Sequence, residues 1–64
     1  MKRADFIRYL RHSGCEFVRE GAKHSVFWNP GNGLVSTVPR HVEINPFMVR
    51  KICRDLGISA PTKK

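Results

Sequence analysis

Acidic residues are scarce in this 64-residue chain, which has five Asp and Glu against twelve Lys and Arg. The five carboxylates are scattered, at Asp5, Glu16, Glu20, Glu43 and Asp55. This scatter gives little support to an acidic two-metal site or to catalysis by a pair of carboxylates. The net charge of +7 predicts instead a polyanionic partner, which is a nucleic acid, an anionic membrane or an acidic protein.

Long apolar runs are also missing. No stretch approaches the ~20 residues that a membrane-spanning helix requires, so a membrane is the weakest of the three candidate partners. The opening residues Met1–Phe6 begin a helical pattern rather than the apolar stretch of a secretory signal. We therefore expect a cytoplasmic protein that makes no use of a membrane.

Cysteine is limited to Cys15 and Cys53, which lack C-x-x-C spacing and each take an apolar position of a predicted element. Small buried hydrophobic residues are the ordinary interpretation. A zinc site that adds His24 and His41 to these cysteines matches no zinc-finger spacing. The chain also lacks a phosphate-binding glycine loop and a helix-turn-helix pattern. We expect neither a metal nor an organic cofactor.

The patterns that are present predict five elements. Helical spacing of apolar residues covers residues 3–13 and a second segment that opens at Asn45-Pro46 and stops at Gly57, while strand patterns cover 15–20, 24–29 and 34–38. Short connections favour antiparallel neighbours. The prediction is an α+β fold of order α-β-β-β-α, with two helices on one face of a three-stranded antiparallel sheet. The other face is left for water or a partner.

The length allows a single domain with a thin core, because a chain of this size buries only about 60% of its unfolded surface. We place that domain at residues 1–58. A flexible basic tail is expected over 59–64, where Pro61 and two lysines follow without an apolar period. With little room for a deep pocket, any chemistry must be carried by few side chains.

Histidine is the residue type that suits such minimal chemistry. RNA carries its own nucleophile, since a base that removes the 2′-hydroxyl proton lets that oxygen attack the adjacent phosphorus. Histidine titrates near neutrality, at about 6.5 when unperturbed. Lys23-His24 places a cation beside such a base, and a cation offsets charge that builds on phosphate oxygens. On this spacing alone, a structural histidine is the more ordinary interpretation.

Several motifs, taken in order, are more specific. They are Gly21-Ala22-Lys23-His24, Phe27-Trp28-Asn29-Pro30, Val38-Pro39-Arg40-His41 with Glu43-Ile44, and Val49-Arg50-Lys51-Ile52 with Leu56-Gly57-Ile58. Together they resemble the HicA toxin family, and the resemblance runs from the first helix to Ile58. It implies a fold similar to the double-stranded-RNA-binding domain. It also implies the toxin of a type II toxin–antitoxin system, a ribonuclease that cleaves messenger RNA and so arrests translation.

The resemblance also assigns a residue and a partner. The family's catalytic histidine falls on His24. Its partner is HicB, an antitoxin protein that blocks the active surface and through which any oligomeric state is expected to arise. One departure concerns the tripeptide before the strand. Many members have Gly-Ser-His, whereas this chain has Ala22-Lys23-His24, which puts a hydroxyl contribution in question and points to a changed substrate preference.

Three further residues are candidates for contacts with RNA phosphate, each with an ordinary alternative. Lys23 binds phosphate or is merely solvated. Arg40 binds phosphate or forms a surface salt bridge with Glu43. His41 binds phosphate or caps the region of the second helix. Each residue type suits the role because it carries, or can carry, positive charge.

Trp28 is the remaining candidate. If Phe27 is the core residue of the second strand, Trp28 shares the open face with His24, and its indole can stack on a base. If Val26 and Trp28 are core, His24 acts from the strand's end.

The alternative to a nuclease is a non-catalytic module that binds double-stranded RNA. Such modules usually dock through lysines at the start of their second helix, where this chain has Phe47.

Overall fold

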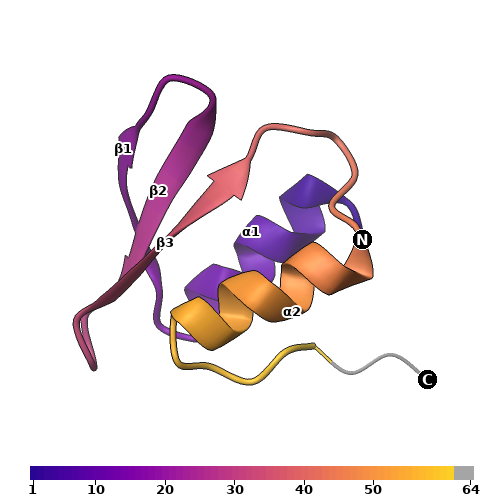
Figure 1. The fold of residues 1–64 in the computed structure, drawn as a ribbon. Coiled ribbons are helices and arrows are strands. Elements are labelled where there is room, and N and C mark those ends of the chain that lie inside the picture. Colours follow the sequence, from indigo (N-terminus) through magenta and orange to yellow (C-terminus); the bar gives the residue numbers. More distant parts are fainter. Residues whose placement is uncertain (62–64) are drawn as a thin grey trace.

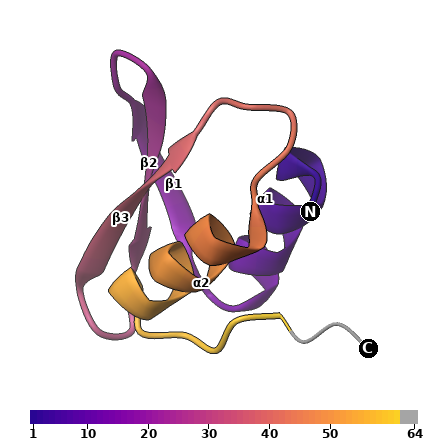
Figure 2. The same cartoon turned by 45° about the vertical axis from the view of Figure 1, so that its right-hand side comes forward.

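The computed structural model describes residues 1–61 and contains the five predicted elements in the predicted order. They are α1 (Arg3–His12), β1 (Glu16–Glu20), β2 (His24–Asn29), β3 (Leu34–Pro39) and α2 (Pro46–Asp55). The strands form one antiparallel sheet in the order β1-β2-β3. In both views the two helices lie on the same side of the sheet and leave its other side bare (Figures 1 and 2). The α-β-β-β-α prediction is confirmed, with ends that differ by at most two residues.

The first helix follows from the placement of its apolar residues. Phe6 and Leu10, four positions apart, are fully buried on the side that faces the sheet. Asp5 lies in the first turn, where a negative charge suits the helix dipole, and His12 lies in the last turn. Gly14 ends the element with a positive φ of 92°, a conformation that glycine adopts without steric cost.

The second helix begins where its sequence signal predicts. The side chain of Asn45 accepts a hydrogen bond from the backbone N–H of Met48 at 2.8 Å, and Pro46 takes the first helical position. An apolar stripe then faces the sheet and α1; it comprises Val49, Ile52, Cys53 and Leu56. The turn between β2 and β3 is fastened to the end of this helix, because Asn29 and Asn32 both donate side-chain hydrogen bonds to the carbonyl of Leu56.

The core lies between the sheet and the two helices. Its ten buried hydrophobic residues are Phe6, Leu10, Cys15, Phe27, Val38, Ile44, Val49, Ile52, Cys53 and Leu56. Phe27 is the central sheet residue of this set and meets Phe17 edge-on at 5.8 Å between ring centroids. Both predicted core cysteines are therefore buried, and burial raises the pKa of Cys53 to about 11.

The first strand departs from simple alternation. Alternation predicts that Glu20 points to the same side as Glu16. In the structure the β1–β2 register shifts between Phe17 and Arg19, so that Glu16 is paired with Trp28 but Glu20 with Ser25. An extra residue of this kind, a β-bulge, reverses the side on which the following residues lie. Glu20 is thereby moved to the helix side of the sheet.

The end of the described chain packs on the body of the domain. Ala60 contacts the hydrophobic core, and the hydroxyl of Tyr9 donates a hydrogen bond to the carbonyl of Ser59. The flexible tail expected over 59–64 falls partly outside the described residues, since 62–64 lie beyond them. Within residues 1–61, no helix has the length and apolar character needed to cross a membrane.

Candidate active site

The uncovered face of the sheet carries two of the predicted site residues. Along β2, exposed His24 and Trp28 alternate with buried Ser25, Phe27 and Asn29. Trp28 is 36% exposed, while Phe27 is 2% exposed. Of the two arrangements that the sequence left open, the structure thus has the one in which Phe27 is the core residue and Trp28 shares the open face with His24.

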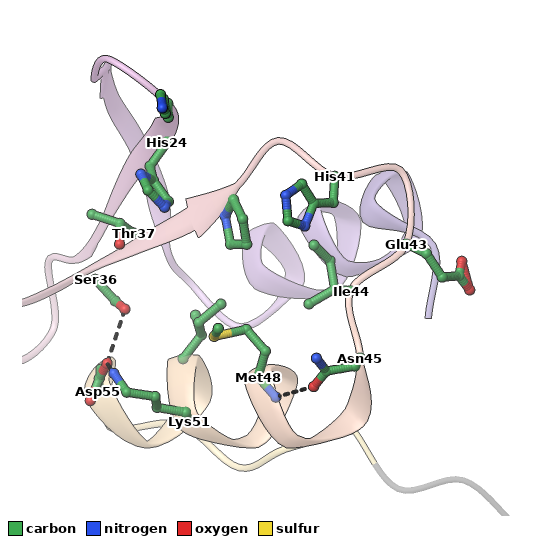
Figure 3. A pocket seen from close by; sticks show the side chains of 13 residues that line it. His24, Ser36, Thr37, His41, Glu43, Ile44, Asn45, Met48, Lys51 and Asp55 are labelled. Atoms are coloured by element: carbon green, nitrogen blue, oxygen red, sulfur yellow. Dashed lines mark hydrogen bonds and ion pairs between the residues drawn. The ribbon is translucent and has the colours of Figure 1, made fainter.

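A cavity of about 430 Å³ lies beside this face, between the free edge of β3 and α2. His24, His41 and Lys23 line one end of it, and Figure 3 shows His24 above the β3 strand and His41 beyond the end of that strand, on the connection to α2. All three side chains are exposed to solvent. The structure therefore brings a base, a second imidazole and a cation, from three separate sequence positions, to the rim of one hollow.

His24 is held by the tight turn that precedes it. The backbone N–H of Gly21 donates a hydrogen bond to the carbonyl of His24 at 2.6 Å, which closes the β1–β2 hairpin. On the other side His24 is paired with Pro39, the last residue of β3. The imidazole thus projects from a strand end that is fixed on both sides, as a catalytic side chain requires.

Arg40 makes an ion pair that the sequence did not predict. Its guanidinium lies 2.6 Å from a carboxylate oxygen of Glu20 and donates a hydrogen bond to the carbonyl of Gly21 at 3.0 Å. The alternative pairing with Glu43 is wrong, because Arg40 pairs with Glu20 and the Glu43 carboxylate lies 3.4 Å from the amino group of Met1. The physical reason is the bulge in β1, which turns Glu20 toward Arg40. Arg40 therefore fastens the hairpin turn that carries Lys23 and His24.

A buried hydroxyl extends this contact into a network. Ser25, which is 1% exposed, donates to the Glu20 carboxylate at 3.0 Å and accepts from the Arg3 guanidinium at 2.6 Å. Arg3 also donates to the carbonyl of Pro39 at 2.9 Å. The network joins α1, β1, β2 and β3 directly behind His24. The hydrogen bond from Ser25, followed by the contacts of Arg40, holds the pKa of Glu20 below its usual value, although burial opposes this.

This network predicts a specific loss of stability in acid. The folded state lowers the pKa of Glu20, so the carboxylate stabilises the fold above the ordinary glutamate pKa of about 4.3. That contribution is lost as the pH falls through the lower folded value. Glu20→Gln should therefore reduce the drop in urea midpoint between pH 7 and pH 3. Glu16→Gln, on the same strand, is the matched control. Equal drops in the urea midpoint of wild type and Glu20→Gln would contradict a stabilising role for the Glu20 carboxylate.

His41 lies in the connection between β3 and α2. It does not cap α2, since that place is taken by Asn45. It lines the cavity instead, together with the apolar side chains of Ile44 and Met48. Of the two roles expected for His41, a contact to phosphate is therefore the one compatible with its position.

The other end of the cavity was missed by sequence reasoning. The polar pattern of the second helix predicts only a solvated face for Lys51 and Asp55. In the structure they form an ion pair of 3.1 Å, and the Ser36 hydroxyl donates to the same Asp55 oxygen at 3.2 Å. These contacts, with Lys51 the largest, lower the pKa of Asp55. The i, i+4 spacing of the pair was the available signal, but not its position opposite β3.

The two cysteines and the two histidines considered above as zinc ligands do not lie together in the structure. Cys15 and Cys53 are buried in the core, whereas His24 and His41 are exposed on the cavity rim. Among residues 1–61, no group of three or more His, Cys, Asp or Glu side chains is placed to hold a metal ion. The groups that can act at the rim are two imidazoles and a lysine.

Comparison with known proteins gives one family. Residues 3–58 match the family described as the HicA toxin of bacterial toxin–antitoxin systems. Neither curated proteins nor solved structures gave a match. The family match covers both helices, the whole sheet and every residue placed at the cavity. The chain belongs to the HicA toxin family.

Proposed function

We propose that this chain is an endoribonuclease that cleaves messenger RNA without a metal ion, with His24 as the general acid/base. The observation that carries the proposal is the position of His24, which is solvent-exposed at a fixed strand end and lies on the rim of a cavity with Lys23 and His41. Family membership supports the same role, because HicA toxins are generally mRNA interferases.

The reaction needs only groups found at this rim. The His24 imidazole takes the proton of a ribose 2′-hydroxyl, and that oxygen bonds to the adjacent phosphorus. The bond from phosphorus to the 5′-oxygen breaks, the departing oxygen takes a proton from solvent, and His24 returns to solvent the proton that it took from the 2′-hydroxyl. The products are a 2′,3′-cyclic phosphate and a 5′-hydroxyl. Lys23 and His41 hold the phosphate and offset the charge that builds on its oxygens. Arg40 holds the turn on which Lys23 and His24 stand, and its half-exposed guanidinium is proposed as a further phosphate contact.

The simplest test is expression in a bacterium. Induced wild-type chain should stop growth and shorten transcripts, and His24→Ala should do neither at equal protein level. Toxicity with intact transcripts would contradict a nuclease. The cytoplasm, where messenger RNA is available, is the proposed place of action.

The open sheet face supplies a second contact with RNA. Trp28 lies on this face with its ring partly exposed, and stacking of a base on an aromatic ring is worth about 1–3 kcal/mol. Trp28→Ala should therefore weaken the binding of single-stranded RNA by roughly tenfold, measured with a 2′-O-methyl oligonucleotide that resists cleavage. Trp28→Phe keeps an aromatic ring and should weaken RNA binding less than Trp28→Ala does. Equal binding by all three proteins would remove Trp28 from the interface.

The non-catalytic alternative finds no support at α2. The first turn of this helix carries Phe47, 70% exposed, where a duplex-RNA binder usually presents lysines. A helix start of this kind offers no charge to the RNA backbone.

An antitoxin partner follows from membership of a toxin–antitoxin family. We propose that a HicB-type antitoxin covers the open face and the rim, because bulky or acidic surface placed there excludes RNA. Charge complementarity with a chain of net charge +7 would speed the association. Continued cleavage by the complex, with His24 accessible, would contradict this arrangement.

A further inference from the structure

The cavity extends well beyond the catalytic rim. It runs along the free edge of β3 to the last turns of α2, where Lys51 and Asp55 lie side by side beneath Ser36 (Figure 3). Its volume of about 430 Å³ falls in the range of small-molecule pockets, about 300–1,000 Å³. The histidine end and the Lys51–Asp55 end thus belong to one continuous hollow.

The walls of this hollow suit the flat, weakly polar faces of a nucleobase. Pro39, Ile44, Met48 and Ile52 supply apolar lining between its two polar ends. Ile44 and Ile52 are each 1% exposed and belong to the hydrophobic core, so the apolar surface open to a ligand comes mainly from the partly buried Pro39 and Met48. Proteins that recognise single-stranded RNA commonly take an unstacked base into such a site and bind its polar edge.

The polar end offers a donor beside an acceptor. Both Lys51 Nζ and Ser36 Oγ donate to Asp55 Oδ2. Within residues 1–61, Oδ1 of the same carboxylate accepts no hydrogen bond from the protein. An ionised carboxylate has about four acceptor positions, and a lysine ammonium has three donors. Asp55 and Lys51 therefore keep unused capacity for a ligand in the cavity.

Among the four bases, guanine fits this pair best. Its Watson–Crick edge has a carbonyl acceptor next to two N–H donors, so the ammonium can meet the carbonyl while the carboxylate accepts from the N–H groups. Adenine and cytosine each offer one amino donor beside an acceptor nitrogen. Uracil offers one N–H between two carbonyls, and the second carbonyl would face the carboxylate. Only guanine presents two adjacent donors.

We propose that the cavity between β3 and α2 is a subsite for one unstacked base of the single-stranded RNA substrate, adjacent to the cleaved linkage. Lys51 and Asp55 recognise the polar edge of this base, and guanine is preferred. This inference rests on the proposed nuclease function, because it takes its ligand from the substrate that His24 would cleave. It adds to that function a position-specific preference for sequence.

The subsite is tested by binding, separately from cleavage. The probes are uridine pentanucleotides with 2′-O-methyl riboses, which cannot be cleaved through the 2′-oxygen. A single guanosine, adenosine or cytidine replaces uridine at each position in turn. At one position guanosine should bind about tenfold tighter than the other bases. Asp55→Asn and Lys51→Gln should each remove this preference. Arg50→Gln is the control. It removes one positive charge from the neighbouring residue of α2, which does not line the cavity, and should keep the guanosine preference.

The outcomes separate the subsite from the nuclease. Equal binding of all bases, or an unchanged guanosine preference in Asp55→Asn and Lys51→Gln at wild-type urea stability, overturns the subsite even if RNA is still cleaved. A guanosine preference in a protein that cleaves no RNA sustains the subsite and contradicts the nuclease. If the two variants weaken antitoxin binding and leave the RNA preference unchanged, the cavity belongs to the protein interface and the subsite is overturned.

Discussion

His24→Ala is expected to lower the rate of RNA cleavage by about 10²–10⁴-fold, because one positioned general base or acid typically contributes that much. The side chain is exposed and faces away from the core, so its truncation should leave the fold intact. The measurement is the cleavage rate of a single-stranded RNA under single-turnover conditions, together with the urea unfolding curve of each protein.

A matched histidine serves as the control for this result. His12, at the end of α1, is also exposed and does not line the cavity. His12→Ala should cleave at the wild-type rate. If His24→Ala retained full activity, the assigned role would be wrong. If both variants lost activity equally, the effect would belong to charge or stability rather than to catalysis.

Phe27→Ala should destabilise the domain severely. Replacing a buried phenylalanine with alanine costs about 3–5 kcal/mol, and this ring is 2% exposed at the centre of the core. A domain of 64 residues has a total stability of roughly 3–10 kcal/mol at about 0.05–0.15 kcal/mol per residue. The substitution therefore removes a large part or all of the stability. Circular dichroism and urea titration would measure the loss.

The same substitution at an exposed site separates burial from residue type. Phe47 is 70% exposed at the start of α2, and a surface change of this kind usually alters stability by less than about 0.5 kcal/mol. Phe47→Ala should keep a urea midpoint close to that of wild type. A comparable loss in both variants would contradict the description of the core.

Elements with strong local signals could be predicted from the sequence. The Asn45-Pro46 start of α2 is one case, because the capping oxygen and the fixed φ of proline act within one turn of the chain. The positive φ of Gly14 and Gly57, just after the two helices, is another. Strand alternation likewise predicted that Phe27 and Trp28 lie on opposite faces of the sheet, but it left open which of the two is buried.

The features that could not be predicted from the sequence depend on how the elements pack in three dimensions. The bulge after Phe17 moves the Glu20 side chain to the other face of the sheet, and no residue type in that segment indicates a bulge. The Glu20–Arg40 contact follows from the bulge and joins residues that are distant in sequence. The pair Lys51–Asp55 has a recognisable helical spacing, but only the packing of α2 against β3 places it at a cavity.

In the proposed reaction an imidazole activates the 2′-oxygen of the substrate itself, and no metal ion takes part. The most direct measurement is cleavage of an RNA in excess chelator, compared with the same RNA carrying a single 2′-deoxy sugar at the cleaved linkage, with mass analysis of the product ends. We predict cleavage of the first RNA to a 2′,3′-cyclic phosphate and a 5′-hydroxyl, and no cleavage of the second at that linkage. Cleavage of the deoxy-substituted linkage, or products that carry a 5′-phosphate, would contradict the claim.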